Sequence, residues 1–478
     1  MPVPIDPTSA AFLYAENRQM PMHVGGLQLF ERPEGAPSDY VRQMYESMSQ
    51  PTDVAPLFLK HPYRGLTTAG QWVWTPDDDF DLEYHFRHSG LPEPGRVREL
   101  LELCSRLHST RLARERPLWE ATLIEGLADG RVAMYTKLHH ALVDGVSAMR
   151  LMQSVMTTDP DRRDVLPMWA DRPRSRSRRA QDDADGGGSV GGVPLEVLRS
   201  TLGSAMGTAL SISADAAGLP GALVKTLSRG LRNETSALSL YAPRTMFNTT
   251  ITGSRRFAAQ GWPLERLRAI GKASGTTLND VVLAMCSGAI RHYLVEQQAL
   301  PESSLVAMVP VGLKASQAHA AGSEGGNALG AVMVRLGTEL DDPADRLAAV
   351  HESMRSGKQA LSSMTPLQIT AMSALGMAPA IVTPMLRLHG MVRPPFNLII
   401  SNVPGPRSTQ YLNGAKMVGT YPLSIPINGM ALNITCNSYV DDMCFGLTGC
   451  RRSVPSLQRL LGHLDDALGD LEKATGAS

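Results

Sequence analysis

Two patterns of hydrophobic positions alternate along the first third of the chain. Residues 23–30 (HVGGLQLF) predict a strand, and residues 98–112 have the helical period of an amphipathic helix. Residues 121–127 and 131–140 flank an Asp-Gly turn and predict a β-hairpin. A helical pattern follows at 145–156. The first third therefore mixes strands and helices.

The second half of the chain repeats this mixture. Residues 263–294 predict a helix, a turn and a second helix, and residues 454–474 predict a closing amphipathic helix. Four further segments have the apolar, β-branched composition of strands: 305–313, 328–338, 396–406 and 430–439. We therefore expect an α/β protein with mixed sheets in both halves.

A change in composition separates the two halves. Residues 159–192 are rich in Pro, Gly, Arg, Asp and Ser and have no apolar period, which predicts a linker. Its arginine run fits either a solvated tether or a contact with phosphates or anionic lipid. The helical stretch that follows, with one apolar face, fits packing on the protein or on a lipid surface. We predict an N-terminal domain at 1–158, a linker with small-residue helices at 159–240, and a C-terminal domain at 241–478.

The overall charge is balanced, with 46 basic and 46 acidic side chains, so no global field favours nucleic acid. The five cysteines form no close CxxC pair and predict reduced thiols in a cytoplasmic protein. No secretory signal pattern opens the sequence.

An uncharged segment stands out at residues 359–386. It is long enough to cross a bilayer, but Pro366, Pro379 and Pro384 and several polar residues interrupt a spanning helix. A buried helical pair or a lipid-facing wall fits it better than a spanning helix.

The stretch KLHHALVDG, residues 137–145, carries the candidate chemistry. In a strand, His139 and His140 point to opposite faces, which makes joint ligation of one metal awkward, so no metal is expected. Asp144 fits an N-cap of the following helix and Gly145 relieves crowding at the turn. The motif alone fits either a polar strand end with a capped helix, or a histidine at a strand end that acts as a general base.

HHALVDG matches the HHxxxDG signature of the chloramphenicol acetyltransferase-like superfamily. Other segments accompany it in order: DPTSAAFLYAENRQMPMHVGGLQLF (6–30), PLWE (117–120), RRFA (255–258), LNDVVLA (278–284), MVPVGL (308–313), GGN (325–327) and SNVPGP (401–406). Together they resemble the bacterial wax ester synthase/acyl-CoA:diacylglycerol acyltransferase family over nearly the whole chain. The resemblance implies two chloramphenicol acetyltransferase-like domains with an active-site tunnel between them.

The resemblance also implies roles for four residues of the motif. His140 inherits the role of general base and His139 a supporting role. Asp144 is implied to orient the loop or to act structurally, and Gly145 leaves space beside the base.

Outside the motif, the resemblance implies that Asn279 and Asp280 support the site. The pattern TTLND by itself also fits an N-terminal helix cap with a solvent-facing Asp280. SNVPGP is interpreted as scaffold, because Pro-Gly-Pro after a strand makes a rigid turn.

The implied reaction moves a long-chain fatty acyl group from acyl-CoA to a lipid alcohol. Diacylglycerol would give triacylglycerol, and a fatty alcohol would give wax ester. Acyl-CoA is a co-substrate and no cofactor is expected; neither a phosphate-binding GxxxxGK[ST] motif nor a GxSxG nucleophile setting occurs. Peripheral contact with a membrane or lipid droplet is expected. The alternatives are a condensation-type acyltransferase with a carrier-bound acyl donor and a non-catalytic lipid-droplet binding protein.

Overall fold

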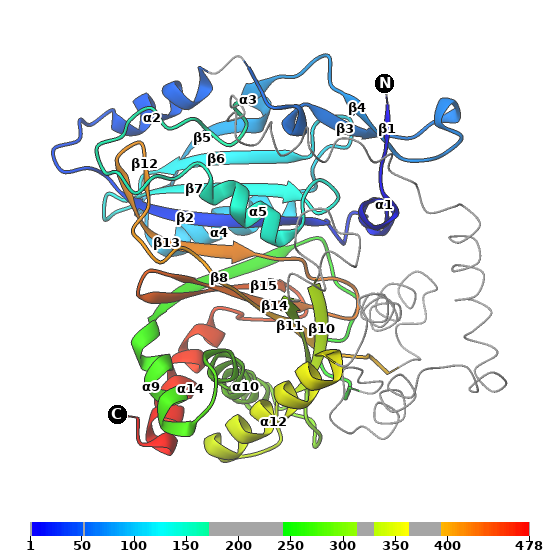
Figure 1. The fold of residues 1–478 in the computed structure, drawn as a ribbon, viewed down its shortest axis with the longest axis vertical. Coiled ribbons are helices and arrows are strands. Elements are labelled where there is room, and N and C mark those ends of the chain that lie inside the picture. The colour runs from blue at the N-terminus through cyan, green and yellow to red at the C-terminus, as the bar shows by residue number, and fades with distance from the viewer. Residues whose placement is uncertain (1, 51–52, 172–241, 313–328, 363–392, 478) are drawn as a thin grey trace.

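The computed structural model describes residues 2–50, 53–171, 242–312, 329–362 and 393–477. Two six-stranded sheets dominate this part of the chain and lie one above the other in Figure 1. Their strand orders are β12-β13-β2-β7-β6-β5 in the upper sheet and β10-β9-β11-β14-β15-β8 in the lower sheet. The predicted mixture of strands and helices in both halves is present.

The upper sheet is built mainly from the N-terminal half of the chain. Its strands are β2 (His23–Glu31), β5 (Phe86–Gly90), β6 (Trp119–Glu125), β7 (Val132–His139), β12 (Tyr411–Leu412) and β13 (Ala415–Leu423). Only β5 and β6 pair in parallel. The helices of this half are α1 (Pro7–Ala15), α2 (Tyr40–Ser49), α3 (Leu82–His85), α4 (Val97–Ser109) and α5 (Gly145–Gln153), and a small sheet joins β1 (Val3–Pro4), β4 (Val73–Pro76) and β3 (Lys60–Tyr63).

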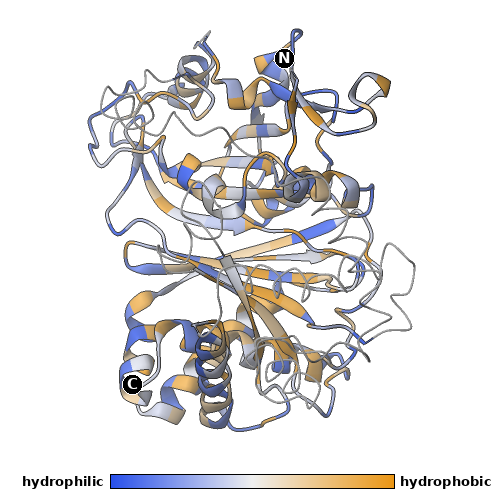
Figure 2. Ribbon diagram, turned by 45° about the vertical axis from the view of Figure 1, so that its right-hand side comes forward, coloured by the Kyte–Doolittle hydropathy of each residue, from blue (hydrophilic) through white to orange (hydrophobic). Residues whose placement is uncertain are grey.

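The lower sheet belongs entirely to the C-terminal half. Its strands are β8 (Arg255–Pro263), β9 (Val306–Gly312), β10 (Leu329–Arg335), β11 (Leu398–Val403), β14 (Leu432–Tyr439) and β15 (Asp442–Cys450). The helices α9 (Leu264–Ser274), α10 (Leu278–Glu296), α12 (Pro343–Ser362) and α14 (Arg459–Thr475) gather below it (Figure 1). Figure 2 shows its strands largely in the hydrophobic colour, and they form one core with the helices.

The strands β12 and β13 cross over from the C-terminal half of the sequence to the upper sheet. Although they come from the C-terminal half of the sequence, β13 pairs antiparallel with β2 from Lys416↔Glu31 to Leu423↔Gly25. The division of the chain at residues 158 and 240 stays a prediction, but in space residues 411–423 complete the upper sheet.

A second contact joins α4 to the outer strand of the lower sheet. The backbone amides of Arg255 and Phe257 on β8 donate to the hydroxyls of Ser109 and Ser105, at 2.8 and 2.9 Å. The two serines thus satisfy the free edge of β8, which would otherwise expose unpaired amides. We refer to this contact between α4 and β8 as the seam.

Most local predictions are confirmed. The hairpin forms as β6 and β7, and α4, α5, α9, α10 and α14 lie where helical patterns predicted them. All five cysteines are free and buried.

Two predictions concern segments that the structure describes only in part. Within residues 159–240 only 159–171 are described, so the rest of the predicted linker lies outside the described residues. The uncharged segment 359–386 is described only at its start, where α12 ends at Ser362. No helix in the described ranges is long and apolar enough to cross a membrane.

Candidate active site

The two histidines lie at the end of β7, the strand between β2 and β6. Every residue of β7 is buried, and the strand ends at His139, so His140 begins the turn that follows. The backbone amide of Ala141 donates to Nδ1 of His139 at 3.0 Å. Because Nδ1 accepts this hydrogen bond, the neutral His139 ring carries its proton on Nε2.

Glu16, the C-cap residue that directly follows α1, faces this proton. Its Oε1 lies 3.4 Å from Nε2 of His139, and both side chains are completely buried. The same carboxylate accepts hydrogen bonds from the Met22 amide and from Nε of Arg114, at 3.2 and 3.0 Å. Burial alone would raise the pKa of Glu16, but His139, Met22 and Arg114 together lower it. Glu16 is therefore an ionised, fully partnered carboxylate behind His139.

The environment of His140 differs. Its side chain is partly exposed, its ring stacks on Phe12 with centroids 4.1 Å apart, and its amide donates to the Met22 carbonyl at 2.8 Å. Burial lowers the pKa of His140, and the nearby Asp144 carboxylate offsets only part of that effect. His140 is thus a neutral imidazole at neutral pH in a partly exposed residue.

This arrangement argues against a shared metal. Both nitrogens of His139 already face protein partners, Nδ1 the Ala141 amide and Nε2 the Glu16 carboxylate. Phe12 lies on α1 and Glu16 directly follows it, four positions later. Phe12 contacts His140, and Glu16 contacts His139.

Asp144 and Gly145 begin α5. Asp144 is the N-cap, and its Oδ1 accepts from the Ser147 amide at 2.7 Å, so the predicted cap is present. Gly145 is exposed, and a Cβ built there would meet no atom of the described residues within 4 Å. The crowding that Gly145 was expected to relieve is therefore not found among the described residues, and that expectation is wrong.

Lys137 and Glu120 tie the strand bearing the histidines to α4. The fully buried Lys137 ammonium donates to the carbonyls of Leu107 and Thr110 at 3.1 and 2.9 Å and lies 3.2 Å from Glu120. Burial lowers the pKa of Lys137, and Glu120 acts in the opposite direction. The PLWE segment, which contains Glu120, thus anchors β7 against the end of α4.

Asn279 and Asp280 lie in a separate cluster at the start of α10. Asp280 accepts from the Thr277 amide and hydroxyl, at 3.0 and 2.8 Å, and is 2.8 Å from Nδ1 of His351. The cap expected from TTLND is present, but Asp280 is buried at 2% exposure, so it does not face solvent. Asn279 accepts a long contact of 3.5 Å from Asn402, a residue of SNVPGP.

The structure therefore assembles part of the predicted site. His139, His140, Asp144 and Gly145 lie in one turn, whereas no hydrogen bond between described residues joins them to Asn279 or Asp280. The sequence analysis does not point to Glu16 or Phe12 as contributors to the site. Their only signal was membership of the 6–30 segment and their spacing of one helical turn.

The described residues also contain one group with metal-ligand spacing. His292 of α10 and His463 and Asp466 of α14 place ligand atoms within 4.8 Å of one another. His463 already lies 3.1 Å from the Glu296 carboxylate. This group links two helices below the lower sheet and has no contact with His140, so we give it no part in the reaction.

Known protein families match this chain along most of its length. Residues 5–282 match the wax ester synthase/diacylglycerol acyltransferase catalytic domain, and residues 325–472 match the WS/DGAT C-terminal domain. A probable diacylglycerol O-acyltransferase, tgs2, of Mycobacterium tuberculosis is 46% identical over 98% of this chain and 99% of its own length. A putative diacylglycerol O-acyltransferase of the same species is 48% identical over 99% of this chain and all of its own length.

Solved structures are also similar to this chain over nearly its whole length. A wax ester synthase/diacylglycerol acyltransferase from Marinobacter aquaeolei VT8 is similar with a TM-score of 0.76 and 42% identity, covering 99% of this chain and 100% of that one. The first condensation domain of the CDA synthetase is similar with a TM-score of 0.55 and 15% identity, covering 99% and 96%, which concerns the fold alone. The mixed α/β fold class with two sheets, predicted from the sequence, is confirmed.

Proposed function

The chain belongs to the wax ester synthase/diacylglycerol acyltransferase family and is an O-acyltransferase, and from this premise we propose that it transfers a long-chain acyl group from acyl-CoA to a lipid alcohol with His140 as general base. The observation that carries the assignment is the contrast between the two histidines. His139 is buried between Glu16 and the Ala141 amide, while His140 is neutral, partly exposed and stacked on Phe12.

The proposed reaction is a direct transfer. His140 removes the hydroxyl proton as the alcohol oxygen attacks the thioester carbonyl, forming a tetrahedral oxyanion. Collapse breaks the carbon–sulfur bond, and the proton on His140 passes to the departing coenzyme A sulfur. General-base help of this kind supplies about 10²–10⁴-fold. The remaining acceleration comes from holding both substrates together and stabilising the oxyanion.

The neighbouring residues take positioning roles in this proposal. His139, held by Glu16, fixes the end of β7 from which His140 projects. Asp144 caps α5 and orients the turn, and Gly145 leaves open space for substrate. Asn279 and Asp280 lie in the separate cluster at the start of α10, and we propose that they support the site from there, with Asp280 held by Thr277 and His351.

The substrates imply contact with lipid. We propose that the active site lies in a tunnel between the two halves, and that the enzyme attaches peripherally to a membrane or lipid-droplet surface. Interfacial attachment is reversible, so alkaline carbonate should release the membrane-associated enzyme. Retention in the pellet after carbonate would contradict peripheral attachment.

The decisive experiment offers purified enzyme one radiolabelled long-chain acyl-CoA and, separately, diacylglycerol, monoacylglycerol and fatty alcohols. Labelled ester with at least one alcohol supports the proposal, and the preferred alcohol separates triacylglycerol from wax ester synthesis. Ester formation only from a carrier-protein thioester would establish the condensation-type alternative. Failure with both donors would favour a lipid-binding protein. A labelled enzyme that survives denaturation when no alcohol is present would contradict direct attack.

A further inference from the structure

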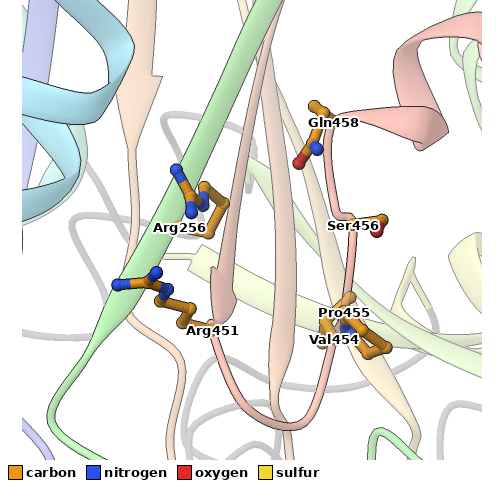
Figure 3. Close-up of a pocket in the computed structure, with 6 residues that line it drawn as sticks. All are labelled: Arg256, Arg451, Val454, Pro455, Ser456 and Gln458. Carbon is orange, nitrogen blue, oxygen red and sulfur yellow. The ribbon is translucent and has the colours of Figure 1, made fainter. Parts of the chain in front are cut away.

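A hollow of about 240 Å³ lies beside the seam (Figure 3). Its lining comes from β8 and from the loop between β15 and α14, and consists of Arg256, Arg451, Val454, Pro455, Ser456 and Gln458. Figure 3 shows both guanidinium groups on the β8 side, with the loop that carries Gln458 standing opposite them. Two like charges thus meet at one hollow.

The protein itself satisfies these two arginines poorly. The Arg256 guanidinium has one ion-pair contact, at 3.7 Å, with the half-exposed Glu102 of α4. For Arg451, which is exposed, no side-chain hydrogen bond or ion pair occurs among the residues that the structure describes. Converging guanidinium groups with unused donors favour an anion, and phosphate matches their planar fork.

The backbone around the hollow is firmly held. The neighbours of Arg256 on β8, Arg255 and Phe257, are bonded to the serines of α4, and the Arg451 amide donates to the Ser254 carbonyl at 3.0 Å. Across the hollow, the Pro455 carbonyl accepts from the Tyr293 hydroxyl at 2.7 Å. A ligand would therefore meet a preformed site at the junction of the two halves.

Hydrogen bonds connect the start of β8 to the proposed general base, His140, through residues 19–22. The guanidinium of Arg255 donates to the Gln19 carbonyl at 2.7 Å, and three residues later the Met22 carbonyl accepts from the His140 amide at 2.8 Å. Three residues span at most about 10 Å. The strand that carries Arg256 is therefore connected, through Arg255 and residues 19–22, to the backbone at His140.

We propose that this hollow binds the 3′-phosphate of the acyl-CoA, an inference that rests on the proposed function. Coenzyme A carries this phosphate at the end opposite its thioester, separated by a long flexible arm. Arg256 and Arg451 would hold the phosphate while the arm carries the thioester to His140. Binding energy from a remote, non-reacting group is a recognised means of raising kcat/KM.

The test compares a long-chain acyl-CoA with the same acyl-dephospho-CoA, which lacks only the 3′-phosphate. Wild-type enzyme should prefer the phosphorylated donor in kcat/KM by about tenfold or more, the worth of a charge-assisted contact. Arg451→Gln and Arg256→Gln should abolish most of this preference and leave kcat/KM for the dephospho donor nearly unchanged. Arg452→Gln is the matched control, because Arg452 is also exposed but does not line the hollow.

Several results would overturn the assignment. One is an unchanged donor preference in the Arg451 and Arg256 variants. A second is an equal loss in the Arg452 variant, which would indicate general charge attraction. A third is a rise in KM that is the same for both donors, which would place the arginines on the diphosphate.

Binding to vesicles containing phosphatidic acid separates a lipid phosphate from the coenzyme. If the two variants weaken vesicle binding while the donor preference persists, the hollow binds a lipid headgroup and the proposal is wrong. Wild-type enzyme that forms no ester with either donor would instead refute the proposed function, and with it this inference. Since Arg451 is exposed, its replacement leaves the fold intact.

Discussion

Replacing Glu16 by Gln tests whether the buried Glu16 carboxylate behind His139 supports the active site. Gln has nearly the same volume, so packing around α1 is retained while the negative charge is lost. The carboxylate that disappears is fully buried and faces His139, Arg114 and the Met22 amide. Gln offers a single acceptor oxygen, so its NH₂ group must point at one of these donors.

These contacts set a range for the loss in the free energy of unfolding. Losing a hydrogen bond to a charged group costs about 1.5–3 kcal/mol, and breaking a buried pair by removing one partner costs about 3–5 kcal/mol. Because Arg114 keeps partial exposure and its bond to the Leu13 carbonyl, we expect a loss of about 3 kcal/mol in the free energy of unfolding. kcat should also fall, since His139 loses the group that fixes its ring.

The assay is urea unfolding of wild type and Glu16→Gln across a range of pH. The pKa of Glu16 in the folded protein lies below its ordinary value of 4.5. The ionised carboxylate therefore stabilises the fold above pH 4.5, and this stabilisation is lost as pH falls through the lowered pKa. The stability gap between the two proteins should be full at neutral pH and shrink below pH 4.5.

Glu31→Gln is the control for this experiment. Glu31 ends β2, the strand beside β7, and pairs with Lys416 at 3.7 Å, but both side chains are about half exposed. Its replacement should change stability by less than about 1 kcal/mol. Equal losses in the two variants, or a gap for Glu16→Gln that does not depend on pH, would refute the supporting role of Glu16.

Four further predictions concern the end of β7 and the turn after it. His140→Ala should lower kcat by at least about 10²-fold with little change in melting temperature or acyl-CoA binding. His139→Ala should lower the melting temperature more than His140→Ala does. Near-normal turnover of His140→Ala would show that another group is the general base. Because the pKa of His140 is lowered, the acid limb of the kcat/KM profile should have its midpoint below pH 6.5. Asp144→Asn should move the acid limb of the kcat/KM profile to still lower pH, because it removes the negative charge that favours the His140 imidazolium; an unchanged acid limb would contradict this. Asp144→Ala should also lower the free energy of unfolding by about 0.5–2 kcal/mol, because the helix cap is lost. Gly145→Ala should fold normally and lose kcat/KM if the open space belongs to the substrate, and full activity of this variant would remove that role.

Local patterns were sufficient for some of the fold. The β6–β7 hairpin and α4 were predictable because their period and turn residues lie within a few positions of one another. The strand β13 was not, since its pattern AKMVGTYPL alternates weakly and its partner β2 lies far away in the chain. A strand is defined by its neighbour as much as by its own residues.

The candidate site shows the same limit. His140 was identified through the HHxxxDG resemblance, and the cap formed by Asp144 from its position before a helix. Glu16 could not be assigned, because an isolated carboxylate after a helix is usually solvated, and only the tertiary fold brings it to His139. Lys137 likewise has no sequence signal for complete burial, since its partners are carbonyls at the end of α4.

The strands that cross over to the upper sheet have a consequence for biosynthesis. A nascent chain that stops before residue 411 has made four of the six strands of the upper sheet, and one edge of β2 has no partner. Unpaired edges recruit strands from other chains, so aggregation is most favourable during this interval of translation. Separate expression of the two halves must therefore supply residues 411–423 to the first half.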